Sequence, residues 1–327
     1  MNAISAAGLS RKFGDFTAVD ALNLEIPKGE VFGLLGPNGA GKTTTISMLC
    51  TILKPSGGSA KVNGFDVESN PADVRRSIGI VFQDQSLDGR LSAFENMEMH
   101  AALYGLDDTD AKNRIEELLG MVELLDRKND LVRSFSGGMK RRIELARGLL
   151  HSPSVLFLDE PTIGLDPQSR AHVWDYIGEI NKKQKLTILM TTHYMDEAEK
   201  LCDRIGIMDK GKLVALDTPQ GLVEKVGTEV LEVTAATNAD AKKLAQFPLA
   251  KSSKISGKNI SIRLASDGSA VPKLFDFASR KKACICGLHT QSASLNDVFL
   301  YYTGSEIREE GADRRDALRA LGRRMGK

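Results

Sequence analysis

The chain has 327 residues, of which 42% are hydrophobic, and its 44 Lys and Arg nearly balance its 43 Asp and Glu. This length suits one large domain plus a smaller one, and the balanced charge gives no global argument for binding nucleic acid or acidic lipid. Apolar runs such as residues 155–158 end quickly in charged residues, and the N-terminus lacks the pattern of a secretory signal, so we expect a cytoplasmic protein.

The first segment predicts an antiparallel hairpin. Residues 4–27 alternate apolar and polar side chains, with a turn at Phe13-Gly14-Asp15. The ring of Phe13 lies just upstream of a glycine-rich loop, where it could stack on an adenine or pack within the hairpin. The residues alone leave both interpretations open.

A phosphate-binding loop follows the hairpin. A short buried strand over residues 31–35 leads into Gly-Pro-Asn-Gly-Ala-Gly-Lys-Thr-Thr, and apolar residues at helical spacing come next. The glycines let backbone N–H groups converge on phosphate at the start of a helix, which favours nucleotide binding over a plain turn. Lys42 is expected to reach the β and γ phosphates, and the Thr43 hydroxyl to bind Mg²⁺. The residues expected to bind the nucleotide here are Gly36, Pro37, Asn38, Gly39, Ala40, Gly41, Lys42, Thr43 and Thr44.

The next stretch predicts a strand and then a group of helices. The strand over residues 77–83 ends on Gln83, whose polar side chain could reach a ligand or begin a loop. Apolar residues at three- and four-residue spacing then predict helices over 95–104, 110–125 and 138–150. We therefore predict a helical subdomain, at about residues 88–152, that can pivot as a unit.

Ser136, Gly137 and Gly138 open the last of these helices. A serine at this position suits an N-cap. The exposed N–H groups and hydroxyl also suit a second anion site. Nothing else in the chain identifies whose phosphate that site would hold.

Two carboxylates end the buried strand over residues 155–158. Burying Asp159 beside Glu160 is costly without a cation, because like charges repel and desolvate badly in a low dielectric. The pair therefore predicts Mg²⁺, held by Asp159 through water, with Glu160 orienting an attacking water. The alternative is a strand that ends at the surface in solvated acids.

A helix over residues 168–184 and a buried strand over 186–192 follow, and His193 ends that strand. Ligands bind at the carboxyl ends of strands in open α/β sheets, although an isolated histidine there is more often structural. Because Gln83 and Glu160 also end strands, we expect all three side chains around one phosphate site.

Together these features closely resemble the ATP-binding subunit of an ABC transporter, over roughly the first two-thirds of the chain. The matching elements are Phe13, the phosphate loop, Gln83, the signature from Ser136, the carboxylate pair, the Leu165-Asp166 turn and His193. The resemblance implies a P-loop ABC cassette with a RecA-like core, an antiparallel β subdomain and a helical subdomain. It implies ATP and Mg²⁺ as cofactors.

The resemblance also assigns roles to residues. The residues implied in catalysis are Lys42, Gln83, Glu160 and His193. The residues implied to bind the metal are Thr43, Gln83 and Asp159, and Phe13 is implied to stack on adenine. Cassettes of this family associate head to tail, so Ser136 and Gly138 of one subunit are implied to close over the phosphate held by the other. One copy cannot form a complete site, so the resemblance implies a dimer. The dimer is a homodimer if both of its cassettes are copies of this chain.

The signature differs from the commonest Leu-Ser-Gly-Gly-Gln, with Phe135 before the serine and Met139 after the glycines. This form and the sequence over residues 294–299 look like the daunorubicin-resistance-type drug exporters, whose ATPases pair with separate ABC-2-type permeases. An exporter of a drug, lipid or glycan is implied, with the chain attached peripherally to the inner face of the membrane. The alternatives are a soluble ABC-type ATPase of translation or DNA repair, and a module that only binds ATP.

The pattern resets after residues 216–219, so we divide the chain into a cassette over 1–216 and an accessory domain over 217–304. The elements expected after the boundary are strands over 228–235, 250–255, 258–265 and 283–289 and helices over 239–247, 270–279 and 294–302. The order βαββαβ predicts a smaller α+β ferredoxin-like module with an interaction or dimer-support role. The charged tail over 305–327 predicts a solvated or packed helix.

Cys284 and Cys286 are the one metal-like pair in the chain, with His289 nearby. Alternation places both thiols on one face of a strand, and no second ligand pair follows. We therefore expect them to pack in the core of that strand and not to bind metal.

Overall fold

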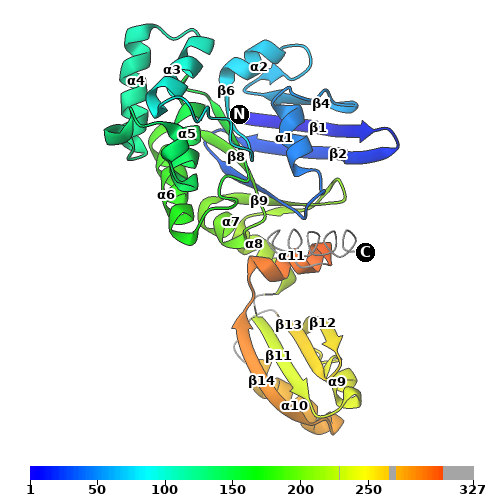
Figure 1. Cartoon of the computed structure of the whole chain (residues 1–327). Coiled ribbons are helices and arrows are strands. Elements are labelled where there is room, and N and C mark those ends of the chain that lie inside the picture. Colours follow the sequence, from blue (N-terminus) through cyan, green and yellow to red (C-terminus); the bar gives the residue numbers. More distant parts are fainter. Residues whose placement is uncertain (228, 265–269, 305–327) are drawn as a thin grey trace, which may run out of the picture.

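A computed structural model describes residues 1–227, 229–264 and 270–304 of the chain, and its strands form three sheets (Figure 1). The largest has six strands in the order β10-β9-β3-β8-β7-β6. Its strands are β3 (Val31–Leu35), β6 (Ile78–Val81), β7 (Val155–Asp159), β8 (Thr187–Thr192), β9 (Arg204–Asp209) and β10 (Lys212–Asp217). All pair in parallel except β10, which is antiparallel to β9. Every residue of β3, β7 and β8 is buried, as the continuous apolar runs predict for a parallel sheet covered on both faces.

The second sheet is antiparallel and confirms the predicted hairpin. Its strands, in the order β2-β1-β4-β5, are β1 (Asn2–Phe13), β2 (Phe16–Pro27), β4 (Gly57–Val62) and β5 (Phe65–Asp66). The two faces of β7 contact different cores because its side chains alternate. Val155 and Phe157 join the core shared with this antiparallel sheet, whereas Leu156 and Leu158 join the core on the other face.

Helices cover both faces of the parallel sheet. They are α1 (Lys42–Leu49), α2 (Pro71–Ser77), α3 (Ala93–Leu103), α4 (Asp108–Met121), α5 (Gly137–Gly148), α6 (Pro167–Gln184), α7 (Met195–Leu201) and α8 (Pro219–Val226), with 3₁₀ turns η1 (Leu125–Arg127) and η2 (Val132–Ser134). Helices α3, α4 and α5 gather on one side, where the helical subdomain was expected (Figure 1). Each begins at a side-chain cap, from Ser92, Asp107 and Ser136 respectively. Helix α4 ends earlier than predicted, because the chain turns through a left-handed backbone at Glu123 (φ 55°).

The packing of α5 against β6 requires a glycine. A Cβ on Gly79 would lie 2.1 Å from the carbonyl oxygen of Gly148. Any larger residue would push the helix away from the sheet. The helix that begins at Ser136 therefore packs directly on a strand of the six-stranded sheet.

The third sheet is fully antiparallel, with the order β12-β13-β11-β14, and lies apart from the other two (Figure 1). Its elements are β11 (Glu229–Ala235), α9 (Asn238–Leu244), β12 (Ala250–Ser256), β13 (Asn259–Leu264), α10 (Ala270–Lys281) and β14 (Ile285–Ser292). The chain order βαββαβ and this strand order agree with the predicted ferredoxin-like module. The sheet and both helices enclose a core of their own.

The helices at the two ends of the predicted accessory domain pack against the cassette. Helix α8 and the last helix, α11 (Leu295–Thr303), contact each other, and their buried side chains belong to the main core on the helical face of the parallel sheet. The boundary that we drew between residues 216 and 217 therefore comes before a helix that packs on the cassette. The expected helical tail over 305–327 lies outside the described residues.

The cysteine prediction was wrong about packing. Both Cys284 and Cys286 are exposed, because the intervening Ile285 packs against the core of the third sheet and alternation turns the two thiols to the other side. Within the described part of the chain, no group of three or more His, Cys, Asp or Glu residues is arranged to hold a metal. No described helix combines the length and apolarity needed to cross a membrane.

The packing of α11 gives a stability test. Phe299 is fully buried in the main core, whereas Tyr301 on the same helix is 52% exposed. We expect Phe299→Ala to lower the free energy of unfolding by about 3–5 kcal/mol, because the lost aromatic leaves a cavity. The matched control Tyr301→Ala should cost about 0.5 kcal/mol or less. Urea unfolding measures both, and equal small losses would contradict the placement of α11 in the main core.

Candidate active site

The phosphate loop joins β3 to α1 and depends on close backbone packing. A Cβ on Gly36 would lie 2.6 Å from the carbonyl oxygen of Met208, and one on Gly41 would lie 2.4 Å from that of Ala18. Gly41 also has a positive φ of 103° and is the N-cap of α1, with no side chain capping the helix. The first-turn N–H groups of α1 therefore face the loop without a cap, as an anion site requires.

Strand order brings the other expected residues to the same edge. Strand β8 lies between β3 and β7, and β6 lies on the far side of β7. Because these strands are parallel, their carboxyl ends share one edge of the sheet. The residues that follow those ends are the phosphate loop, His193, Glu160 and Gln83.

Lys42 lies folded against its own loop. Its side chain is 6% exposed, and Nζ donates to the carbonyl oxygens of Gly36 at 2.7 Å and Pro37 at 3.3 Å. The same nitrogen lies 3.8 Å from Oε1 of Glu160. The loop thus holds a buried cation next to the carboxylate, at the place expected for phosphate charge.

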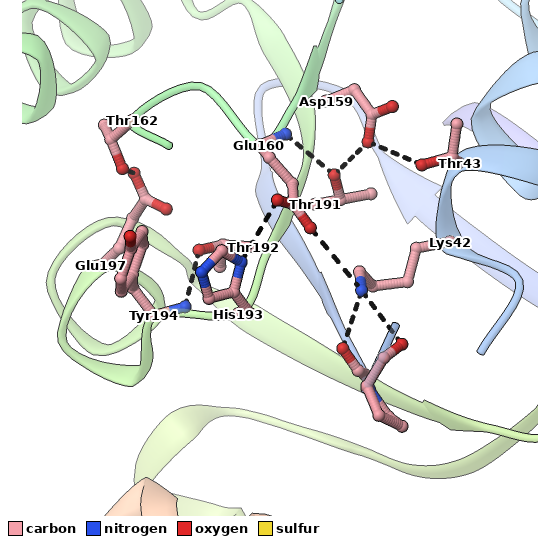
Figure 2. Close-up of polar contacts among 12 residues, drawn as sticks. Lys42, Thr43, Asp159, Glu160, Thr162, Thr191, Thr192, His193, Tyr194 and Glu197 are labelled. Atoms are coloured by element: carbon pink, nitrogen blue, oxygen red, sulfur yellow. Dashed lines mark hydrogen bonds and ion pairs between the residues drawn. The ribbon is translucent and has the colours of Figure 1, made fainter. Parts of the chain in front are cut away.

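Asp159 turns toward the loop helix, away from Glu160, as alternation along a strand predicts (Figure 2). Its Oδ1 accepts from the Thr43 hydroxyl at 3.2 Å and from the Thr191 hydroxyl at 2.5 Å. A carboxylate and a hydroxyl so close together are the hard oxygen ligands that Mg²⁺ prefers, so these residues fit that ion. Sequence analysis missed Thr191; its signal was a hydroxyl near the carboxyl end of a buried strand.

Glu160 is held between the side chains of Lys42 and His193. Its Oε2 lies 3.2 Å from Nδ1 of His193, opposite the Lys42 contact, as Figure 2 shows. Its backbone is left-handed, with φ 48°, and its N–H donates to the Thr191 hydroxyl at 3.0 Å. Burial raises the pKa of Glu160, but the hydrogen bond and charge of His193, and then Lys42, outweigh it and leave the pKa below its ordinary value. The group is therefore an ionised carboxylate at neutral pH, fixed in one orientation.

A cavity of about 360 Å³ lies over the phosphate loop. It is lined by loop residues and also by Phe13, Gln83 and Glu160. Phe13 is 45% exposed, and the guanidinium carbon of Arg11 in the same strand lies 4.6 Å from the centre of its ring. Phe16, which sequence analysis did not single out, lines the same cavity and is 62% exposed.

The signature residues lie elsewhere. The side chain of Ser136 caps α5 by accepting from the Met139 N–H at 3.2 Å, which confirms the predicted cap. With Gly138 it borders a second hollow of about 130 Å³. Among the described residues the two hollows share no lining residue. Within one copy of the chain, then, the phosphate loop and the signature do not meet.

Two buried ionisable residues around the site were also missed. Glu197 of α7 is fully buried, and its Oε1 accepts from the Thr162 hydroxyl at 2.9 Å and from the indole N–H of Trp174 at 2.8 Å. Arg141 of α5 is 4% exposed and contacts the backbone that carries Glu160. Motif spacing did not reveal either one, because both act through contacts between segments distant in sequence.

A phosphate loop after a buried strand, with carboxylates and a histidine at neighbouring strand ends, defines a P-loop nucleotide-hydrolysing protein. A family model described as "ABC transporter" matches residues 19–163. The chain belongs to the ATP-binding proteins of ABC transporters, in the branch of exporter ATPases that includes drug-resistance proteins. It binds ATP and hydrolyses it.

Several curated relatives cover nearly the whole chain. The linearmycin resistance ATP-binding protein of Bacillus subtilis is 36% identical, over 94% of this chain and 100% of its own. The daunorubicin/doxorubicin resistance ATP-binding protein of Streptomyces peucetius is 39% identical, over 92% of each. A Nod factor export ATP-binding protein of Cupriavidus pinatubonensis is 36% identical, over 91% of this chain and 90% of its own. These relatives favour the exporter interpretation over a soluble ATPase of translation or DNA repair.

Solved structures match the cassette. The structure of cbiO1 from Clostridium perfringens, described as part of an ABC transporter complex, has a TM-score of 0.63 and 29% identity, over 69% of this chain and 94% of that chain. A cassette solved as a dimer with ADP and phosphate has a TM-score of 0.60 and 25% identity, over 66% of this chain and 98% of that chain. The predicted cassette fold is thereby confirmed.

Glu197 gives a pH test. Burial raises the pKa of Glu197, so the folded state binds its proton more tightly than the unfolded state. The contribution of this bound proton to the free energy of unfolding is fully present at pH values below the ordinary pKa of a glutamate. It is lost as the pH rises to the raised pKa of the folded state. Glu197→Gln keeps an acceptor oxygen for Thr162 and Trp174 but cannot titrate.

We expect the unfolding free energy of the wild type to fall relative to that of Glu197→Gln as pH rises above 4.5, the ordinary pKa of a glutamate. The limiting slope is about 1.4 kcal/mol per pH unit for one proton. Urea unfolding at each pH measures the difference, with the exposed Glu179→Gln as control. Parallel pH profiles for wild type and Glu197→Gln would contradict a raised pKa of Glu197.

Proposed function

We propose that two copies of this chain form a head-to-tail dimer whose ATP hydrolysis powers export through separate ABC-2-type membrane subunits. The observation that carries the catalytic part is Glu160, an ionised carboxylate held between Lys42 and His193 beside the phosphate loop. The dimer is supported by the separation of the two hollows, since the phosphate loop and the signature at Ser136 line different ones.

In this proposal each ATP lies in the loop of one copy, with its adenine on Phe13 and its β and γ phosphates at Lys42. Glu160 accepts a hydrogen bond from the attacking water and aims it at the γ-phosphate, because its carboxylate is already fixed in position. His193 orients Glu160 through Nδ1, which leaves its other ring nitrogen for the γ-phosphate. Gln83 reaches the same phosphate from the neighbouring strand end.

The ion and the second copy complete the site. Thr43, Asp159 and Gln83 would hold Mg²⁺, which when bound neutralises charge on the β and γ phosphates. Ser136 and Gly138 of the second copy would contact the γ-phosphate from the opposite side, with N–H groups at the start of α5. ATP therefore bridges the two copies, and its hydrolysis releases them.

The proposed cargo is a hydrophobic drug, lipid or glycan. Relatives named for linearmycin resistance, daunorubicin and doxorubicin resistance and Nod factor export support this range. The chain would attach to the inner face of the cell membrane through its permease. The helical subdomain would pass its motion to that partner.

The C-terminal sheet is proposed as an interaction or dimer-support module. A division that follows the hydrophobic cores joins residues 1–227 with 294–304 and leaves residues 229–292 as the accessory unit. This proposal moves our sequence-based boundary from 216 to about Gly227, and it returns α11 to the cassette.

Glu160→Gln tests the catalytic assignment. The amide cannot carry the negative charge that orients and activates water, whereas the loop that binds ATP is unchanged. We expect ATP affinity within about threefold of wild type and turnover lower by about 100-fold or more. Phosphate release and nucleotide titration measure the two quantities, with Glu179→Gln as the surface control. Turnover near the wild-type rate would refute the role of Glu160.

The same variant tests the membrane partner. Tagged Glu160→Gln with ATP and Mg²⁺ should recover a multi-spanning membrane protein in near-stoichiometric amount from detergent-solubilised host membranes, identified by mass spectrometry. Recovery of ribosomal or DNA-repair proteins in its place would contradict the exporter proposal.

A further inference from the structure

Arg141 of α5 is a buried arginine with a complete set of acceptors. Its side chain is 5% exposed and lies five positions after the signature serine, Ser136. A guanidinium has five N–H donors in a planar fork. The acceptors here are Pro161 O for Nε at 2.6 Å, Phe82 O and Glu144 Oε2 for Nη1 at 2.5 and 3.1 Å, and Asp159 O and Glu160 O for Nη2 at 3.2 and 3.1 Å.

These acceptors join two functional segments. Three of them are successive carbonyl oxygens, from Asp159 to Pro161, in the backbone on either side of the catalytic carboxylate. A fourth is the carbonyl oxygen of Phe82, the residue before Gln83. One side chain of the signature helix therefore fixes the peptide groups that aim both Glu160 and Gln83.

The backbone at Glu160 requires such a contact. Its left-handed conformation, unusual for a residue with a side chain, persists only where surrounding contacts hold it. Burial lowers the pKa of Arg141, but guanidinium groups stay charged in proteins. The charge is balanced by Glu144, whose side chain is 2% exposed.

Two further side chains on the same face of α5 form hydrogen bonds with the segment after Gln83. Glu144 accepts from the Ser86 N–H at 2.8 Å, and Arg147 donates to the Ser86 carbonyl oxygen at 3.1 Å and to its hydroxyl. Arg141, Glu144 and Arg147 are spaced by three residues, which places them along one side of a helix. Three side chains of the helix that begins at the signature therefore form hydrogen bonds with the segment over residues 82–86.

We propose that Arg141 is a positioning residue for hydrolysis, which couples the signature helix to Glu160 and Gln83 within one subunit. This proposal rests on the function proposed above for Glu160 and Ser136. When the signature engages the nucleotide of the second copy, α5 moves as a unit, and Arg141 transfers that movement to the carbonyl groups around Glu160. The carboxylate then reaches its working position only in a closed dimer.

Arg141→Lys tests the coupling with the least change in volume and charge. A lysine has a single ammonium and cannot span acceptors on two segments in the plane of a guanidinium. We expect kcat lower by about tenfold or more, with ATP affinity and KM within about twofold of wild type. We also expect an ATP-bound dimer to accumulate, because closure is intact and hydrolysis is slow. Phosphate release, nucleotide titration and gel filtration with ATP measure these quantities.

The matched control is Arg114→Lys in helix α4, whose arginine contacts Glu117 and the carbonyl oxygen of Leu149 away from the site. Its kcat should stay within twofold of wild type. A second variant, Glu144→Gln, removes the charge that balances Arg141 and should lower kcat severalfold at unchanged KM. Thermal melting gives the folded fraction of each variant, so that each kcat can be stated per folded molecule.

Three results separate the possibilities. Normal kcat in both Arg141→Lys and Glu144→Gln would overturn the proposal while leaving the function of Glu160 intact. If Arg141→Lys loses ATP binding and dimer formation as well as turnover, the proposal is also overturned, because such a result indicates a purely structural role. Failure of the underlying function is recognised independently, by wild-type turnover in Glu160→Gln.

Discussion

The structure depends on a buried negative charge that must stay ionised. Glu160 lies at a strand end where burial disfavours its charge, and only the close approach of Lys42 and His193 reverses that effect. Those two residues come from different strand ends, so the contact exists only when β3, β8 and β7 are adjacent and in register. The sheet order, the glycine contacts of the phosphate loop and the seating of α5 on β6 all serve this arrangement. The catalytic carboxylate is therefore as much a product of the whole cassette as of its own strand.

Much of the site could be predicted from the sequence because its residues follow strands. Strand ends of a parallel sheet meet at one edge, so Gln83, Glu160 and His193 could be grouped before their distances were known. The hairpin, the capped helices and the βαββαβ order were likewise predictable, because alternation and capping residues are local signals. The contact of Lys42 with its own loop carbonyls had no such signal, since it depends on how the loop folds back.

Contacts made through the backbone were not predictable. Arg141 resembles any arginine on a half-polar helix, yet most of its acceptors are carbonyl oxygens, which leave no trace in the side-chain pattern. Glu197 and Thr191 are buried polar residues whose partners are far away in sequence. The packing prediction for Cys284 and Cys286 failed because alternation places both thiols on one side of a strand but does not say which side the core covers. The position of α11 depends on tertiary packing against α8 and the main core, which lie before the accessory sheet in the sequence.

The central claim is that each ATP site is shared between two copies, and a mixing experiment tests it most directly. Ser136→Asp keeps an N-cap residue for α5 but sets a negative charge where phosphate would bind. Neither Ser136→Asp nor Glu160→Gln should turn over ATP alone. An equimolar mixture contains mixed dimers with one site free of both defects, so we predict a burst of about one phosphate per mixed dimer in a single-turnover assay. No burst above that of the separate variants would contradict a shared site and place the whole reaction within one copy of the chain.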